Sequence, residues 1–270
     1  MSSKRFAGDA RHWPGLAFTT FLFFVYVYLP IAVLIALSFN ENRTVTVWTG
    51  FSLDWYRVAF ANDDMVRAAT NSLLIAAIAS TSATVLATLA ALRMETDRFR
   101  GKAAFNALVA LPITVPEIVP AVATLMFFVM LRNWFGFDLG LGNIMIAHSV
   151  FCIPFAFMPI RARLQDMDVT LEHAARDLYA SAWNAFRHVT LPLLMPGVIA
   201  GAMLAFVISF DDFIITQMIS GPGTTTLPVY IYSMIRQGVT PEVNAASTIL
   251  IVVSTVFVTV YWYVSRPKKT

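Results

Sequence analysis

Six long apolar stretches constrain the fold of this chain more than any other feature. Each holds about 20 predominantly apolar residues, enough for one helix across a hydrocarbon core of about 30 Å. The chain is 58% hydrophobic and only 13% charged, about half the charged fraction of a typical soluble domain. We therefore predict an all-α integral membrane protein with one domain over residues 1–270. The six expected spans are 15–39, 68–92, 104–131, 143–162, 197–219 and 244–264.

Lys and Arg residues are unevenly divided between the two sides that these spans define. With both termini inside, 14 of the 19 basic residues are cytoplasmic. Because cytoplasmic loops are enriched in Lys and Arg, we predict cytoplasmic termini. The apolar stretch that follows Lys4, Arg5 and Arg11 is too long for a cleaved signal, so we expect it to remain as the first span.

The longest predicted cytoplasmic stretch, residues 163–195, has a helical pattern of its own. Apolar residues recur at three- and four-residue steps over 171–186, which predicts an amphipathic helix. Thr170 is expected to cap this helix, and Pro192 and Pro196 are expected to separate it from the fifth span. Its apolar face needs a covering surface, either lipid or protein. The scarcity of basic residues favours protein.

The sequence carries no motif for nucleotide hydrolysis or metal catalysis. It has no phosphate-binding loop, no dinucleotide-binding glycine pattern and no His-Glu-x-x-His motif. Its four histidines are dispersed and Cys152 is its single cysteine, so we expect no metal site and no cofactor in this chain. Its basic residues are too scattered to bind nucleic acid. We predict a transport protein, not an enzyme, driven by an ion gradient or a separate ATPase.

A motif in the cytoplasmic stretch resembles the EAA loop of ABC importer permeases. It reads HAARDLYAS at residues 173–181 and VTLP at 189–192. His173 stands where that family has Glu, and Tyr179 stands where it has Gly. The resemblance implies that this loop couples the chain to an ATPase. The coupling residues that it implies are Glu172, His173, Ala174, Ala175, Arg176, Asp177, Leu178, Tyr179, Leu191 and Pro192.

Further segments extend the resemblance over nearly the whole chain, to the permease subunits of spermidine/putrescine ABC importers. They are NSL at 71–73, FRGK at 99–102, PEIV at 116–119, SFDDF at 209–213, GP at 221–222, LP at 227–228, IYSM at 231–234 and GVTPEVNA at 238–245. The resemblance implies a type I permease fold in a bacterial inner membrane. It also implies a sister permease, expected to form a heterodimer with this chain, and a periplasmic binding protein. Two copies of an ABC ATPase would bind the ATP and Mg.

Three carboxylates interrupt the third and fifth apolar stretches. On an ideal helix, Asp211 lies about 21 Å and Glu117 about 20 Å from the cytoplasmic ends of their spans. A charge inside the membrane is costly and usually functional, so we predict that Glu117, Asp211 and Asp212 line a path for a cation. Phe210 and Phe213 are expected to contact its methylene or ammonium groups. Alternatively, each acid marks the outer end of a shorter helix.

We predict a permease subunit for polyamines or a related small amine, which would form half of the translocation path. Two other functions stay open at this point. One is a permease of the same fold for an aminophosphonate, an amino-acid derivative or a ferric chelate. The other is a stand-alone secondary transporter. The latter would need coupling-ion sites and usually inverted repeats, and we find no convincing repeat. An independent transporter would also leave the predicted docking loop unexplained.

Overall fold

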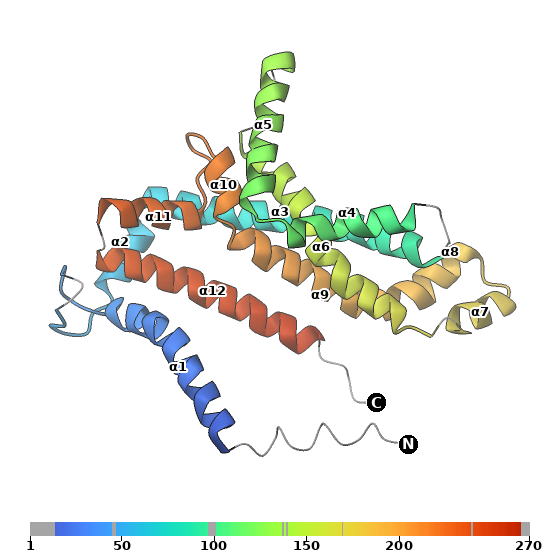
Figure 1. Cartoon of the computed structure of the whole chain (residues 1–270), viewed down its shortest axis with the longest axis horizontal. Helices are drawn as coiled ribbons and strands as arrows, with labels where there is room; N and C mark the ends of the chain where they lie inside the picture. Colours follow the sequence, from blue (N-terminus) through green and yellow to red (C-terminus); the bar gives the residue numbers. More distant parts are fainter. Residues whose placement is uncertain are drawn as a thin grey trace. The chain divides into compact units, whose positions relative to one another are not determined.

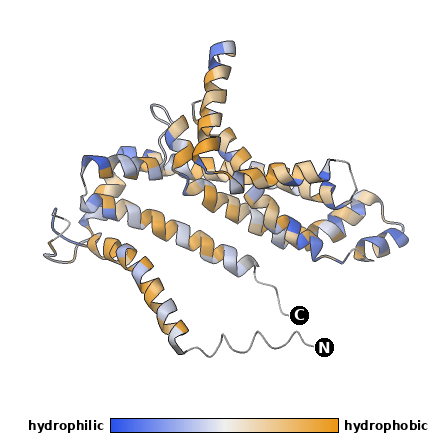
Figure 2. Ribbon diagram, in the orientation of Figure 1, coloured by the Kyte–Doolittle hydropathy of each residue, from blue (hydrophilic) through white to orange (hydrophobic). Residues whose placement is uncertain are grey.

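The computed structural model describes residues 14–44, 47–96, 101–136, 138, 140–168, 170–238 and 240–265, and most of these residues are helical. Six of its helical segments are long and apolar enough to cross a membrane, which confirms the all-α membrane prediction (Figure 2). Several residues used above lie outside the described part. They are Lys4, Arg5, Arg11, Arg98, Phe99, Arg100, Val239, Arg266, Lys268 and Lys269.

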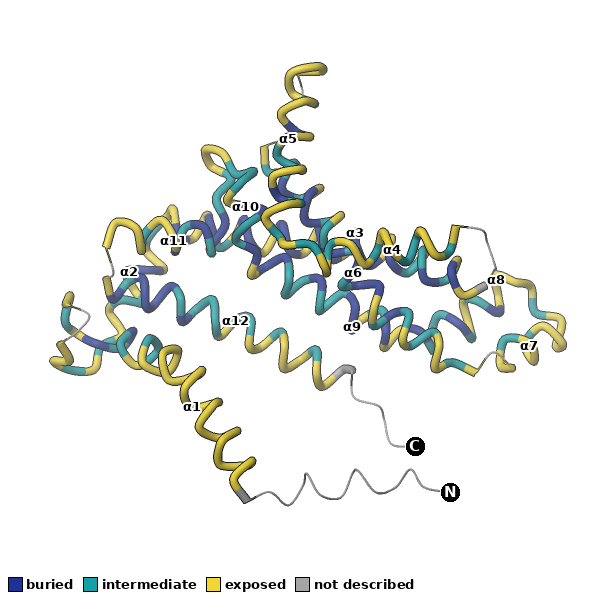
Figure 3. The backbone as a smooth tube through the Cα atoms, viewed as in Figure 1, coloured by how far each residue is buried: buried dark blue, intermediate teal, exposed yellow. Residues whose placement is uncertain are grey.

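The chain divides into two compact units. The first comprises residues 1–61 and 234–249 and contains α1 (Pro14–Leu37), α2 (Asp54–Ala61) and the start of α12 (Pro241–Ser265). Most of α1 is exposed in the isolated chain (Figure 3), as expected for a helix whose solvent is lipid. The loop after α1 is organised by buried Asn40, whose amide Nδ2 donates to the Val47 carbonyl at 2.8 Å.

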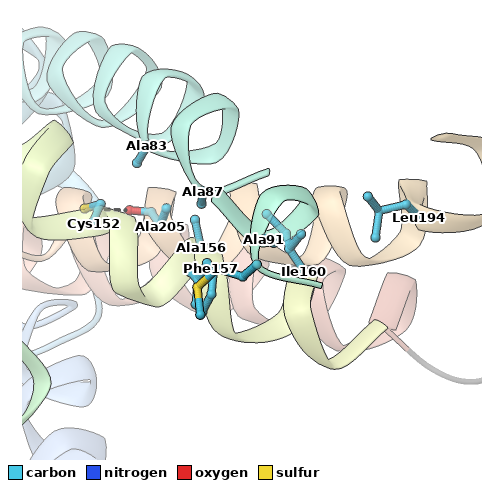
Figure 4. Close-up of a cluster of buried hydrophobic side chains, with 10 residues drawn as sticks. Ala83, Ala87, Ala91, Cys152, Ala156, Phe157, Ile160, Leu194 and Ala205 are labelled. Carbon is cyan, nitrogen blue, oxygen red and sulfur yellow. Dashed lines mark hydrogen bonds between the residues drawn. The ribbon is translucent and has the colours of Figure 1, made fainter. Parts of the chain in front are cut away.

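The second unit, residues 62–233 and 250–270, is built on three long helices: α3 (Asp63–Thr96), α6 (Leu141–Gln165) and α9 (Leu191–Phe210). Their contact combines five alanines and Cys152 with larger side chains that include Phe157, Ile160 and Leu194 (Figure 4). Ala83, Ala87 and Ala91 recur every fourth residue along one face of α3 and are fully buried. Between membrane helices, where no hydrophobic effect operates, small residues permit the close backbone approach that gives good packing.

Glycine makes the closest approach in this core possible. A Cβ atom added at Gly201 of α9 would lie 2.6 Å from the backbone carbonyl oxygen of Ala156 on α6. Cys152 of α6 is buried against α9, and its thiol donates to the Ala205 carbonyl of α9 at 3.4 Å. The α6–α9 interface therefore depends on residues with little or no side chain.

The third predicted span is two helices instead of one. Residues 104–131 fall in α4 (Lys102–Thr114) and α5 (Ile118–Phe135), which run in different directions (Figure 1). The physical reason is Pro116, which has no N–H to donate and disfavours helical geometry at the preceding residue. Val115 is accordingly extended, with ψ 137°. Of these two helices, only α5 is long enough to span the membrane.

The fifth predicted span, 197–219, also differs from the structure. The helix stops at Phe210, and α10 (Ile214–Ile219) begins only after a non-helical turn at Asp211–Asp212. At the other end, Pro192 does not separate α9 from the preceding segment. The π-helical turn η2 (Phe186–Thr190) connects α8 (Ala182–Ala185) directly to α9, because a wider backbone register accommodates the missing proline donor.

The cytoplasmic helix predicted over 171–186 is interrupted as well. The structure has α7 (Thr170–Asp177) and the short α8, joined by a turn. Thr170 is the first residue of α7, not its cap. The Asp168 carboxylate accepts the Thr170 backbone N–H at 2.9 Å. This bond, with one from the Thr170 hydroxyl, holds the pKa of Asp168 below its usual range.

Candidate functional site

The turn between α9 and α10 presents two adjacent carboxylates to different surroundings. Asp211 is exposed in the isolated chain, and its carboxylate accepts a hydrogen bond from the Ser254 hydroxyl of α12 at 2.6 Å. No Lys or Arg among the described residues forms an ion pair with it. Asp211 therefore directly follows the candidate membrane span Ala182–Phe210, and its described partner is a neutral hydroxyl.

Asp212 points into the protein and is 7% exposed. Its carboxylate accepts the backbone N–H groups of Ile215 at 3.1 Å and Thr216 at 3.3 Å. These donors belong to the first turn of α10, where a new helix has no intrahelical partners for its N–H groups. Asp212 thus satisfies the backbone at the helix break.

A buried histidine that the sequence analysis did not single out completes this arrangement. Nε2 of His148, on α6, lies 3.6 Å from the Asp212 carboxylate, and the two side chains are only 1% and 2% exposed. The same ring nitrogen is 3.0 Å from the Thr216 hydroxyl, and Nδ1 is 2.8 Å from the Ser209 hydroxyl. One signal was available, because His148 is an ionisable residue inside the fourth apolar stretch.

The other predicted path residues lie around this turn. Phe210 is buried and stacks on Phe206 at 5.9 Å between ring centroids. Phe213 is half-buried, with its ring 4.8 Å from that of Tyr232. Glu117 is half-buried at the start of α5, which packs along α10. The structure therefore gathers four of the five residues at one break and places the fifth on a neighbouring helix.

An apolar cavity of about 370 Å³ lies between α4, α5, α6 and α10. Its lining includes Pro112, Phe127, Phe151 and Ile215, but none of the three predicted carboxylates. Because its walls are almost entirely apolar, we do not assign the cation path to it.

In the coupling segment, Glu172 ties α7 to the π-helical turn. Its carboxylate accepts from Arg176 Nη2 at 2.6 Å and from the Thr190 hydroxyl at 3.1 Å. A cavity of about 320 Å³ lies beside α7, and its lining residues include Glu95 and Asp168. The remaining predicted coupling residues differ in exposure. Ala175 and Leu191 are half-buried, whereas the exposed ones are His173, Ala174, Asp177, Leu178, Tyr179 and Pro192.

Tyr179 ends α7 in the left-handed conformation, with φ 62°. Its N–H donates to the Arg176 carbonyl at 3.0 Å, and the Ala180 N–H donates to the Ala175 carbonyl at 3.1 Å. This pair of bonds is the Schellman motif, in which glycine is preferred at the position that Tyr179 occupies. The tyrosine side chain is 99% exposed. The position thus calls for an unusual backbone dihedral, and the described part of this chain leaves the ring uncovered.

No set of three or more His, Cys, Asp or Glu side chains that could hold a metal ion occurs within the described ranges.

Residues 83–267 match the protein family described as "Binding-protein-dependent transport system inner membrane component". The chain is 39% identical over 245 residues to the spermidine/putrescine transport system permease protein PotC of Escherichia coli (strain K12), which covers 91% of each protein. It is 38% identical over 243 residues to the putrescine transport system permease protein PotI of the same strain, covering 89% of this chain and 86% of PotI.

Solved structures give the same fold. A chain in the crystal structure of a bacterial ABC transporter involved in the import of the acidic polysaccharide alginate matches with a TM-score of 0.74 at 19% identity, covering 97% of this chain and 98% of that one. A chain of the MetNI methionine ABC transporter matches with a TM-score of 0.62 at 18% identity, covering 74% of this chain and 96% of that one. At such identities the likeness establishes the fold alone, and the predicted fold is confirmed.

Proposed function

Because this chain belongs to the family of binding-protein-dependent transport system inner membrane components, we propose that it is a permease subunit of an ATP-driven importer for polyamines or a related small amine. Identity of 39% to PotC over 91% of both chains supports the solute class. The chain is a multi-pass protein of a bacterial inner membrane. In this proposal it forms half of a translocation path.

The observation that carries the proposal is the environment of Asp211. Its carboxylate is exposed at a helix break and has the Ser254 hydroxyl as its described partner. A carboxylate at membrane depth needs a counter-charge or water. A passing ammonium group supplies that charge, whereas an anionic solute would be repelled. Glu117 is assigned to the same path. Asp212 is assigned mainly to the turn, since two backbone N–H groups donate to its carboxylate.

The α7–α8 segment is assigned to the ATPase partner. Leu178, Tyr179 and Trp183 are 82%, 99% and 64% exposed, and large apolar side chains gathered on a surface are typical of a protein interface. A chain without a nucleotide-binding motif needs a separate source of energy. We assign that role to two ABC ATPase subunits, which would bind and hydrolyse ATP. A sister permease and a periplasmic binding protein complete the proposed assembly.

Uptake by the reconstituted transporter tests the solute assignment. With the binding protein, sister permease and ATPase in proteoliposomes, radiolabelled putrescine or spermidine should accumulate only when ATP is supplied. Asp211→Asn keeps the shape and the Ser254 bond but removes the charge. Losing a charged contact of about 1.5–3 kcal/mol should slow uptake roughly 10- to 150-fold. Stimulation of ATP hydrolysis by the loaded binding protein should persist.

The matched control is Asp138→Asn, which neutralises an exposed carboxylate paired with Arg132 at 3.5 Å. This variant should transport at the wild-type rate. Wild-type uptake by both Asp211→Asn and Glu117→Gln would refute the cation path. A wild-type transporter that imports a different solute with its own binding protein, and no polyamine, would refute the solute class and leave the family membership intact.

A further inference from the structure

We propose that His148 is a positioning residue for the translocation path. It holds the break between α9 and α10 in one geometry and thereby sets the direction of the Asp211 carboxylate. The inference rests on the proposed cation path at Asp211, and it assigns a role to a buried residue on a different helix.

The imidazole ring bridges the two sides of the break. Nδ1 lies 2.8 Å from the hydroxyl of Ser209, in the last turn of α9, and Nε2 lies 3.0 Å from the hydroxyl of Thr216, in α10. All three residues are at least 96% buried. A ring with hydrogen bonds on opposite edges fixes the spacing between the two helix ends. Because the ring extends from α6, it fixes the position of the break relative to the three-helix core.

The break needs such support because it interrupts helical hydrogen bonding directly after the candidate membrane span Ala182–Phe210. Interrupting a helix there leaves backbone N–H groups without partners, and each costs free energy unless the protein satisfies it. Asp212 satisfies two of them, but its buried carboxylate itself requires stabilising contacts. Nε2 of His148 lies 3.6 Å from this carboxylate, beyond hydrogen-bond distance, and 3.0 Å from the hydroxyl of Thr216, whose backbone N–H donates to Asp212. The histidine therefore reaches the residue that closes the turn through Thr216.

Fixing Asp212 also fixes Asp211. The two are consecutive, so rotating the turn to move one carboxylate moves the other. With Asp212 directed inward to α10, Asp211 is directed to Ser254 on α12 and to the exposed side. If His148 is lost, the turn is free to rotate and the path carboxylate loses its defined direction.

A double-mutant cycle on uptake tests this role. His148→Leu removes both hydrogen bonds at similar volume, and it should slow polyamine uptake roughly 30-fold, the combined value of two ordinary bonds. A residue that acts through Asp211 has nothing left to act on once that charge is gone. The double variant His148→Leu/Asp211→Asn should therefore be no slower than Asp211→Asn alone. ATP hydrolysis stimulated by the binding protein should persist in both single variants.

Cys152→Ala is the matched control. It removes another buried side chain of α6 that contacts α9, at the Ala205 carbonyl and away from the break. In the double variant Cys152→Ala/Asp211→Asn, the fold-reductions in uptake of the two single variants should multiply. If the His148→Leu effect multiplies in the same way, His148 has a packing role only and the inference is overturned, while the path proposal stands. If Asp211→Asn alone transports at the wild-type rate, both fail.

Milder variants keep the test decisive if His148→Leu does not assemble. Ser209→Ala and Thr216→Val each remove one hydrogen bond and leave the ring in place. Each should slow uptake less than His148→Leu and show the same loss of effect in the Asp211→Asn background. His148→Asn, which can still donate to one side of the break, should recover part of the uptake. Multiplicative behaviour of both Ser209→Ala and Thr216→Val would overturn the proposal.

Discussion

The three-helix core and the α7–α8 segment use apolar residues in opposite ways. In the core, Ala83, Ala87 and Ala91 are fully buried, and Gly201 lets α9 approach the α6 backbone. In the α7–α8 segment, Leu178 and Tyr179 are large and almost entirely exposed. Small residues thus mark surfaces that the chain closes against itself, whereas large exposed ones mark a surface for another molecule.

The difference has a physical cause. In a membrane, helices associate by close packing, which favours small side chains. Between water-exposed protein surfaces, burial of large apolar and aromatic groups supplies the free energy of binding. Outside the membrane spans, large exposed apolar residues therefore indicate the surface that we assign to a protein partner, whereas the exposed apolar residues of α1 face lipid.

The largest effect is expected from overfilling the core. Gly201→Leu places a Cβ atom where only 2.6 Å separates it from the Ala156 carbonyl oxygen, and backbone cannot move aside as a flexible side chain can. Overpacking typically costs about 1–3 kcal/mol, and a backbone clash belongs at or above the upper end. We expect little folded protein and a sharply lowered melting temperature in detergent.

Gly15→Leu controls for the added side chain. A Cβ atom at Gly15 of α1 meets nothing within 4 Å, so this variant should fold and melt as the wild type does. Equal stability of the two variants would show that the α6–α9 contact is looser than the structure has it.

The second-largest effect is expected at the exposed surface. Leu178→Asp should leave the melting temperature of the permease unchanged, because the side chain contacts mainly solvent. A charge in an interface centre costs about 2 kcal/mol or more, so the affinity for the ATPase should fall roughly 30-fold. Co-purification of the ATPase and ATP-driven uptake measure this loss. Trp48→Asp is the control, because Trp48 is exposed and lies between the first two predicted spans, on the side opposite the predicted cytoplasmic termini. This variant should keep ATPase binding. Undiminished ATPase binding by Leu178→Asp would remove α7–α8 as the docking site.

The helices and the membrane class were predictable from the sequence because apolar length and low charge are strong local signals. The interruptions were not. Pro116 interrupts the third apolar stretch, whereas the helix continues from the π-helical turn η2 into α9 at Pro192. The same residue type has opposite outcomes, because Pro192 lies in the first turn of α9, where no intrahelical N–H bond is lost, whereas Pro116 follows the extended Val115. Sequence spacing alone does not contain that information.

The candidate site was predicted in part for a related reason. Asp211 and Asp212 are identical neighbours in the sequence, so only the turn geometry separates an exposed acid from a buried one. His148 is distant in sequence and contacts the turn through tertiary packing. For Tyr179, the resemblance identified an unusual residue, but the structure was needed to show the left-handed dihedral and the exposure.

A smaller effect of opposite sign is expected at Tyr179. A left-handed residue other than glycine costs about 1–2 kcal/mol, partly offset by the greater chain entropy of glycine, so Tyr179→Gly should stabilise the permease by about 0.5–1 kcal/mol. If the ring is an interface anchor, the same variant should bind the ATPase more weakly. Thermal unfolding and ATPase affinity measure the two effects. Tyr179→Phe should leave both nearly unchanged, and a Tyr179→Gly variant with undiminished ATPase affinity would show that the ring is not an anchor.

The smallest effect is expected at the ion pair on α7. Glu172→Gln removes the charge that faces Arg176 at 2.6 Å, but the amide oxygen still accepts from Thr190. Both side chains are more than a third exposed, so solvent screening limits the pair to about 0.3–0.5 kcal/mol. Backbone amides of α7 should exchange hydrogen roughly twofold faster at low salt, and the difference should vanish near 1 M salt as screening removes the attraction. Asp177→Asn is the control on the same helix. It removes another negative charge and should not produce the same salt-dependent increase in hydrogen exchange. If hydrogen exchange in Glu172→Gln were ten or more times faster, α7 would depend on this carboxylate for its attachment to η2. The α7–α8 segment would then be less independent of single polar contacts than the three-helix core.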